Sequence, residues 1–135
     1  MKDVTHIFPV MTYDVDFAGI VSNIVYIRWL EDLRNLFASQ VLSIDDGLRR
    51  QIAPVLSRTE IDYLTPARFP DELEGRMWLI ERGRARFVLS AEFKSRRAGV
   101  VTARARQRGV FVSLSDFRPV PLPSEFMKFD LAKDS

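Results

Sequence analysis

The stretch TYDVDFAGIVSNIVYIRWLEDLR, residues 12–34, places two carboxylates, a glycine and an asparagine directly before an apolar pattern with helical spacing. Asp14 and Asp16 are two positions apart, so in an extended segment their side chains lie on the same side. Aspartate is a favoured helix-cap and turn residue. A carboxylate in this place can also act as a base for water or as a nucleophile. Both interpretations stay open at this point.

The helical pattern continues to about residue 42, because apolar residues recur there with the period of an amphipathic helix. The sequence predicts one long helix of about five turns. Its expected apolar face consists of Ile20, Ile24, Ile27, Leu30, Leu33, Phe37 and Val41. The segment SIDDGLRR, residues 43–50, is expected to form a loop or a short helical turn.

Alternating patterns predict strands on both sides of this helix. Residues 4–16 indicate a strand or extended arm that is interrupted at Pro9. The strands predicted after the helix cover residues 58–64, 76–83, 84–94 and 100–108. At Gly109 the apolar positions change from odd to even numbers, as Val110 illustrates, and this change predicts a β-bulge there.

A strand, one helix and then about four strands in succession favour an α+β fold with an antiparallel sheet over repeated βαβ units. A length of 135 residues fits a single domain with one core, residues 1–135. A small sheet also leaves edges without partners. Pairing of one edge with a second copy therefore predicts a symmetric oligomer.

The composition is that of an ordinary globular protein, with 47% apolar and 28% charged residues, so disorder is not expected. The chain has no cysteine, which excludes disulfides, a thiolate nucleophile and thiolate metal sites. The first ten residues lack the apolar region of a signal peptide, and no run approaches the ~18 apolar residues of a membrane span. We therefore expect a soluble, cytoplasmic protein with no membrane partner.

The net charge is only +2, but the basic residues are concentrated in one block of the sequence. Between Arg76 and Arg108 there are ten basic residues and two acidic ones. Such a block can meet an anion or can simply solvate strand faces. It also raises the alternative of a nucleic-acid binder, but the arginines alternate with core residues and no nucleic-acid motif is present. A nucleic-acid partner is therefore not expected.

The segment DFAGIVSNIVY, residues 16–26, followed by IRWLEDLR, resembles hotdog-fold thioesterases of the 4-hydroxybenzoyl-CoA thioesterase family. The segments IDYLTPARFPDEL, residues 61–73, and FRPVPLPSEF, residues 117–126, extend the resemblance over nearly the whole chain. The resemblance implies a hotdog fold, in which a curved antiparallel sheet of five to six strands wraps one long central helix. It also implies dimers, often paired into homotetramers, with active sites at the subunit interface.

The implied activity is that of a hydrolase, which cleaves an acyl thioester of coenzyme A or of a carrier protein without a metal or redox cofactor. By this resemblance Asp16 occupies the acidic catalytic position, as base or nucleophile, and Asp14 is a supporting or solvated residue. Gly19 lets the backbone turn sharply and approach a ligand. The backbone amide of Asn23 is the implied donor to the developing oxyanion.

Aromatic residues near this stretch are candidates to line an acyl pocket, namely Phe17, Tyr26 and Tyr63, although such residues commonly belong to a core. Lys94, Arg96 and Arg97 form a basic turn that could bind the phosphates of coenzyme A or of a pantetheine arm. A charged turn can equally be a solvated one.

One departure from the family pattern concerns histidine, because Ile20, Ser22 and Asn23 stand where many relatives carry one. The only histidine is His6, which is distant in the sequence. A histidine-assisted mechanism is therefore not expected, and a hotdog dehydratase is disfavoured. The alternative that stays open is a non-catalytic module that binds acyl-CoA or an acyl carrier on the same fold.

Overall fold

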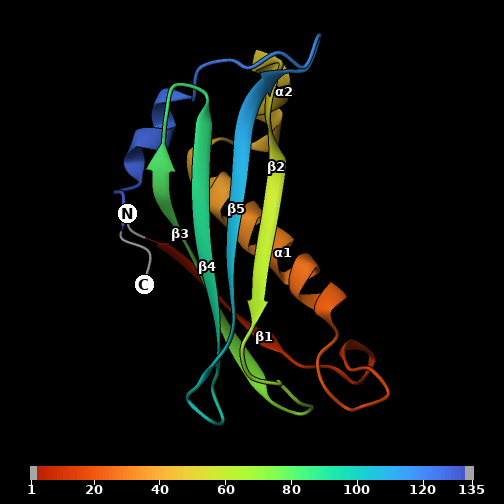
Figure 1. The fold of residues 1–135 in the computed structure, drawn as a ribbon. Helices are drawn as coiled ribbons and strands as arrows, with labels where there is room; N and C mark the ends of the chain where they lie inside the picture. Colours follow the sequence, from red (N-terminus) through yellow and green to blue (C-terminus); the bar gives the residue numbers. More distant parts are fainter. Residues whose placement is uncertain (1–2, 133–135) are drawn as a thin grey trace.

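The computed structural model describes residues 3–132, and within this range it contains five strands, two α-helices and two short 3-10 helices (Figure 1). The elements follow the chain in the order β1 (Asp3–Pro9), η1 (Thr12–Asp14), α1 (Asn23–Val41), α2 (Ile44–Arg50), β2 (Ile52–Tyr63), β3 (Glu72–Arg82), β4 (Arg86–Ser95), β5 (Val101–Ser113) and η2 (Ser124–Lys128). The predicted α+β class is confirmed. No helix in this range is long and apolar enough to cross a membrane.

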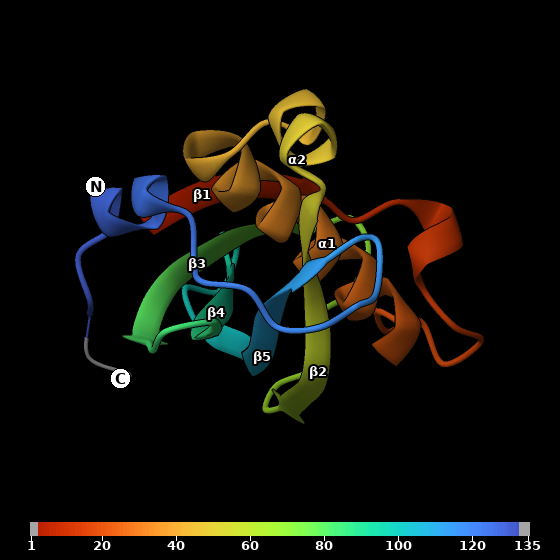
Figure 2. The same ribbon diagram turned by 90° about the horizontal axis from the view of Figure 1, so that it is seen from above.

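The five strands form one antiparallel sheet with the order β1-β3-β4-β5-β2. β1 and β2 flank the helices in the chain and become the two edges of the sheet. Seen from above, the sheet curves around the side on which α1 lies (Figure 2). The antiparallel sheet is therefore as predicted, and the edge strand β2 is twelve residues long.

The core lies between α1 and the inner face of the sheet. The α1 residues that are buried there are Val25, Tyr26, Trp29, Leu30, Leu33, Phe37 and Val41. The prediction that Ile24 and Ile27 belong to this face is wrong, because their exposed fractions are 67% and 45%. Both positions lie beside the buried stripe, where the larger rings of Tyr26 and Trp29 occupy the interior and contact Phe93 in edge-on and tilted arrangements.

Residues 43–50, for which a loop or a short turn was expected, include the helix α2. The Ser43 hydroxyl accepts a hydrogen bond from the Asp46 N–H at 3.1 Å and caps the helix. The helix ends at Gln51, which has a left-handed φ of 56°. β2 then starts at Ile52, six residues before the predicted strand, and Pro54 is tolerated because β2 is an edge strand.

The sequence places a β-bulge near Gly109, and the β2–β5 register does shift there, between Leu56 and Arg58, although the extra residue, Ser57, belongs to β2. The predicted change of face in β5 is wrong, because Gly109 and Phe111 continue its inner face. A Cβ added at Gly109 would lie 2.2 Å from the Cζ atom of Phe87. The glycine is therefore an inward position at which the ring of Phe87 takes the place of a side chain.

Candidate active site at the start of α1

Hydrogen bonds to Asp16 from the residues that follow it hold the loop between η1 and α1 in a tight turn. One carboxylate oxygen of Asp16, Oδ1, accepts hydrogen bonds from the N–H groups of Ala18, at 2.9 Å, and Ile20, at 3.4 Å. The Asp16 N–H in turn donates to the Ile20 carbonyl at 2.9 Å. The side chain therefore organises a turn and does not cap α1, whose N-cap residue is Ser22. Oδ2 of Asp16 accepts no hydrogen bond within residues 3–132, and the side chain is exposed.

Asp14 occupies a different environment from Asp16, although the two are close in sequence. Its exposed fraction is 6%, and its Oδ2 accepts a hydrogen bond from the Met11 N–H at 2.9 Å. Its carbonyl accepts from the Ser22 N–H at 2.9 Å. Of the two interpretations of Asp14, the structure therefore favours support of the loop over solvation.

Gly19 has a φ of +80°, in the left-handed region that a residue with a Cβ adopts only with strain. Its N–H donates to the Asp16 carbonyl at 2.9 Å. No atom lies within 4 Å of an added Cβ. The glycine is thus required by the turn itself, and the space beside it is open to a ligand.

α1 begins without a side-chain cap, since the Ser22 hydroxyl makes no capping hydrogen bond. The Val25 N–H donates to the Ser22 carbonyl at 3.0 Å. The N–H groups of Asn23 and Ile24, which are the first two of the helix, have no acceptor within residues 3–132. These two donors carry the positive end of the helix dipole and are available to an anion or oxyanion.

A small cavity of about 120 Å³ lies at this end of α1. It is lined by Ile20, Val21, Asn23, Tyr26, Tyr63, Leu64, Thr65, Pro66, Ala67 and Thr102. The Tyr63 hydroxyl donates to the Asn23 carbonyl at 3.4 Å. The structure therefore brings together Asn23, Tyr26 and Tyr63, three of the residues singled out from the sequence. Asp16 and Gly19 lie on the loop that leads into the cavity but do not line it.

Tyr26 is held at the back of this cavity. Its hydroxyl donates to the Thr102 Oγ1 at 3.0 Å, and burial raises the pKa of the hydroxyl while this hydrogen bond acts in the opposite direction. Tyr26 is therefore a neutral wall of the cavity at physiological pH. Thr102 was not recognised from the sequence, because its role depends on the pairing of β5 with β4.

Phe17 does not line the cavity. Its side chain is fully exposed next to Asp16. Tyr13, on η1, is also largely exposed. Within one protomer these rings therefore form no acyl pocket, and a substrate-binding role for Phe17 stays a prediction.

The basic turn lies at the same end of the molecule. In Figure 1 the turn between β4 and β5 lies at the same lower end of the molecule as the connection from β2 to β3 and the loop that precedes α1. Lys94, Arg96 and Arg97 are all exposed, and the Arg96 Nη1 lies 3.4 Å from the Glu72 Oε1. These exposed cations, of which Arg96 is paired with Glu72, face solvent at the end of the molecule where α1 begins.

Asp71, which the sequence did not single out, fixes the conformation of this turn. It accepts hydrogen bonds from the Ser95 hydroxyl, from the Glu72 N–H at 2.7 Å and from the Arg97 N–H at 3.1 Å. Burial alone would raise the pKa of Asp71, but these hydrogen bonds outweigh it and lower the pKa below its ordinary value. The only hint in the sequence is its position after proline in the segment that resembles the thioesterases.

No group of three or more histidine, aspartate or glutamate side chains within residues 3–132 is arranged to hold a metal ion.

The curved antiparallel sheet of five strands with a helix against it is consistent with the hotdog fold, and solved structures share this architecture. A 1,4-dihydroxy-2-naphthoyl-CoA thioesterase from Synechocystis superimposes with a TM-score of 0.83 and 23% identity, covering 93% of each chain. A gentisyl-coenzyme A thioesterase gives a TM-score of 0.80 and 22% identity, covering 92% of this chain and 99% of that one. A Staphylococcus aureus protein in complex with CoA gives a TM-score of 0.86 and 16% identity, covering 92% and 78%.

The model of the thioesterase-like superfamily matches residues 10–129. The chain therefore belongs to the thioesterase-like superfamily, and the identification made from the sequence is confirmed. No curated protein sequence matches the chain.

Proposed function

We propose that the protein hydrolyses an acyl thioester of coenzyme A, or of a carrier protein, to a free acid and a thiol. One observation carries the proposal. In a chain of the thioesterase-like superfamily, a carboxylate with one unengaged oxygen, Asp16, stands on a hydrogen-bonded turn directly before two unpaired N–H groups of α1. Base or nucleophile and oxyanion donors are the two components that thioester hydrolysis needs.

We infer separate tasks for the two oxygens of Asp16 from their hydrogen bonds in the turn. Oδ1 holds the loop, while Oδ2 takes a proton from water or attacks the thioester carbonyl itself. When Oδ2 attacks, the carbon–sulfur bond breaks, the thiolate leaves, and water then hydrolyses the acyl-aspartyl anhydride to the free acid and restores the carboxylate. When Asp16 acts as a base, the water oxygen bonds to the carbonyl carbon, the carbon–sulfur bond breaks and the proton passes on to the leaving thiolate. The N–H groups of Asn23 and Ile24 stabilise the negative charge on the carbonyl oxygen in between.

The remaining parts of the site bind the substrate. The cavity with Tyr26 and Tyr63 receives the acyl carbon chain or ring next to the reacting carbonyl. Lys94, Arg96 and Arg97 bind the phosphates of coenzyme A or of a pantetheine arm. Solved thioesterases of this fold whose names specify naphthoyl and gentisyl substrates support an acyl-CoA as the substrate.

The proposal includes a homodimer or homotetramer. β2 is a long edge strand with one unpaired side, and the exposed Phe17 beside Asp16 lacks a partner within the protomer. A second copy would cover both and complete the site.

The proposal also includes a hotdog arrangement with α1 as its central helix, a single domain over residues 1–135, a cytoplasmic location and a reaction without metal or redox cofactor. All of these stay predictions.

Release of free thiol from a panel of aromatic and aliphatic acyl-CoAs tests the activity. We expect at least one substrate to reach a kcat/KM of about 10⁴ M⁻¹s⁻¹ or more, the lower end of the usual range for enzymes. Equilibrium binding of the same compounds is measured in parallel. Tight binding without thiol release would contradict the proposal and establish the non-catalytic module instead.

A further inference from the structure

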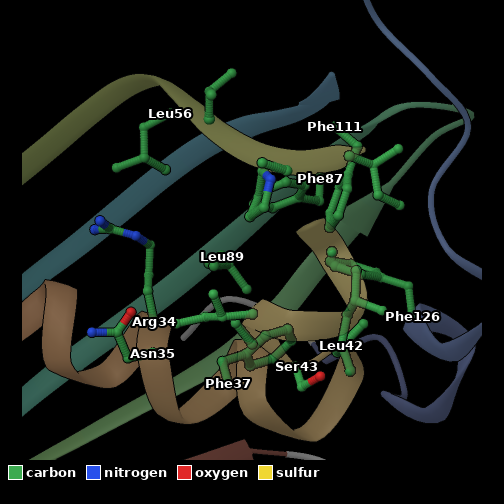
Figure 3. Close-up of a pocket in the computed structure, with 18 of the residues that line it drawn as sticks. Arg34, Asn35, Phe37, Leu42, Ser43, Leu56, Phe87, Leu89, Phe111 and Phe126 are labelled. Carbon is green, nitrogen blue, oxygen red and sulfur yellow. The ribbon is translucent and has the colours of Figure 1, made fainter. Parts of the chain in front are cut away.

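A second and larger cavity lies away from Asp16, between the C-terminal half of α1, α2 and the beginning of β2 (Figure 3). Its volume is about 380 Å³, within the range of about 300–1,000 Å³ that is usual for ligand pockets. The first α1 residue that lines it is Glu31, eight positions after Asn23, which corresponds to about 12 Å along the helix. Within one protomer this cavity is therefore separate from the one beside Asp16.

Aromatic and aliphatic side chains form most of the wall. Phe37 comes from α1, Phe87 and Leu89 come from β4, Phe111 comes from β5 and Phe126 comes from η2. In Figure 3 the rings of Phe111 and Phe126 lie at one side of the cavity, and Arg34 lies at the other. The cavity thus has an apolar body, with Arg34 as its only cation among the lining residues and the Glu31 carboxylate next to it.

The guanidinium of Arg34 is the unusual feature of this wall. Its side chain is only 24% exposed, and burial lowers its pKa against the opposing effect of Glu31. The only carboxylate within ion-pair distance in residues 3–132 is that of Glu31, whose Oε1 lies 3.7 Å from the Arg34 Nη2 and whose side chain is 64% exposed. A pair at this distance with one solvated member compensates the charge weakly.

Arg34 also makes a hydrogen bond to a neutral side chain, that of Gln107, and this bond engages only part of its guanidinium. The Arg34 Nη1 donates to the Gln107 Oε1 at 3.2 Å, and the Gln107 Nε2 donates to the Thr59 Oγ1 at 3.2 Å. These two hydrogen bonds connect α1 to the inner face of the sheet, where Gln107 is buried with an exposed fraction of 2%. The hydrogen bond to Gln107 uses one of the five guanidinium N–H donors and adds no negative charge to the weak compensation by Glu31.

We propose that this cavity binds a small carboxylic acid, with the carboxylate on Arg34 and the hydrocarbon or aryl body against the phenylalanine rings. The apolar wall suits a hydrocarbon or aryl group, and the weakly compensated guanidinium suits a negative charge. The cavity therefore favours an amphiphilic anion over a neutral ligand of the same shape. A carboxylate accepts two hydrogen bonds from the guanidinium fork and supplies the missing negative charge. The site needs no thioester and does not depend on hydrolysis at Asp16.

Isothermal titration with 4-phenylbutyrate and with its neutral analogue 4-phenyl-1-butanol tests the site. We expect the acid to bind wild-type protein at least tenfold more tightly than the alcohol, because a hydrogen bond to a charged group is worth about that factor. Arg34→Gln should remove this preference while leaving the alcohol affinity unchanged. Arg49→Gln, on the exposed side of α2, is the matched control and should change neither affinity.

Two further variants keep the outcome decisive. Ala38→Phe places a ring into the cavity from α1 and should abolish binding of both compounds with Arg34 in place, which matters if Arg34→Gln does not fold. Asp16→Asn should leave the acid affinity unchanged, so failure of the hydrolysis proposal and failure of this one are distinguishable. Equal affinity for acid and alcohol, an acid preference that survives Arg34→Gln, binding that survives Ala38→Phe, or no binding to wild-type protein would each overturn the proposal.

Discussion

Replacing Asp16 by asparagine separates the hydrogen bonds that its side chain makes in the turn from the catalytic task that we propose for it. Asparagine keeps an Oδ1 that can accept from the N–H groups of Ala18 and Ile20, so the turn can keep its hydrogen bonds. The position is exposed, and no buried group loses a partner. We therefore expect the free energy of unfolding to change by no more than about 0.5 kcal/mol.

Turnover should respond very differently, because the amide NH₂ that replaces Oδ2 can neither take a proton from water nor attack a carbonyl. Loss of such a group lowers kcat by roughly 10²- to 10⁴-fold. At about 1.36 kcal/mol per tenfold, this is a loss of about 2.7–5.4 kcal/mol of transition-state stabilisation. KM should change little, since the cavity and the basic turn are untouched. Thiol release gives kcat and KM, and thermal unfolding monitors the fold.

Asp14→Asn is the matched control. The Asp14 carboxylate is buried and accepts a hydrogen bond from the Met11 N–H, so its replacement disturbs the packing of the loop. It does not remove the unengaged Oδ2 of Asp16. We expect a loss of stability and near-normal turnover. If Asp16→Asn keeps near-full turnover, or if its turnover falls only because the protein unfolds, Asp16 is a turn residue and the catalytic assignment is wrong.

Three other predictions address the basic turn, its support and the assembly. Replacing Lys94, Arg96 and Arg97 by alanine should raise KM for acyl-CoA with little change in kcat, and an equal effect on an acyl thioester without the nucleotide would refute a role in binding phosphate. The folded state lowers the pKa of Asp71, so ionised Asp71 stabilises the fold above its ordinary pKa of 3.8 and this stabilisation disappears as the pH falls through the folded-state value. Asp71→Asn should therefore destabilise the protein most near neutral pH and least in acid, and a pH-independent difference in urea unfolding would contradict this. Sedimentation should show a dimer or tetramer, whereas a monomer that is fully active at nanomolar concentration would disprove a shared site.

The parts of the fold that the sequence predicts are those set by a local period. The helix expected over residues 23–42 is observed as α1, Asn23–Val41, and the alternation in residues 84–94 is observed as β4. The errors arise where tertiary packing decides. Ile24 fits the helical period yet is exposed, because the interior beside it is occupied by aromatic rings. After Gly109 the even-numbered apolar positions were interpreted as a change of face, whereas Gly109 stays on the inner face of β5, where the ring of Phe87 takes the place of a side chain.

The two aspartates show how far a candidate site can be predicted from the sequence. An extended segment would place Asp14 and Asp16 on the same side, but the 3-10 turn η1, Thr12–Asp14, ends between them and turns the first inward and the second outward. The residue spacing contains no sign of this turn, so the pattern alone left the choice between the two carboxylates to the resemblance. The structure supplies an independent physical criterion. The Asp14 carboxylate is enclosed and holds the loop, whereas Asp16 makes the hydrogen bonds of its own turn with one oxygen. The other oxygen of Asp16 accepts no hydrogen bond within residues 3–132, and this difference favours Asp16 as the catalytic residue that we propose.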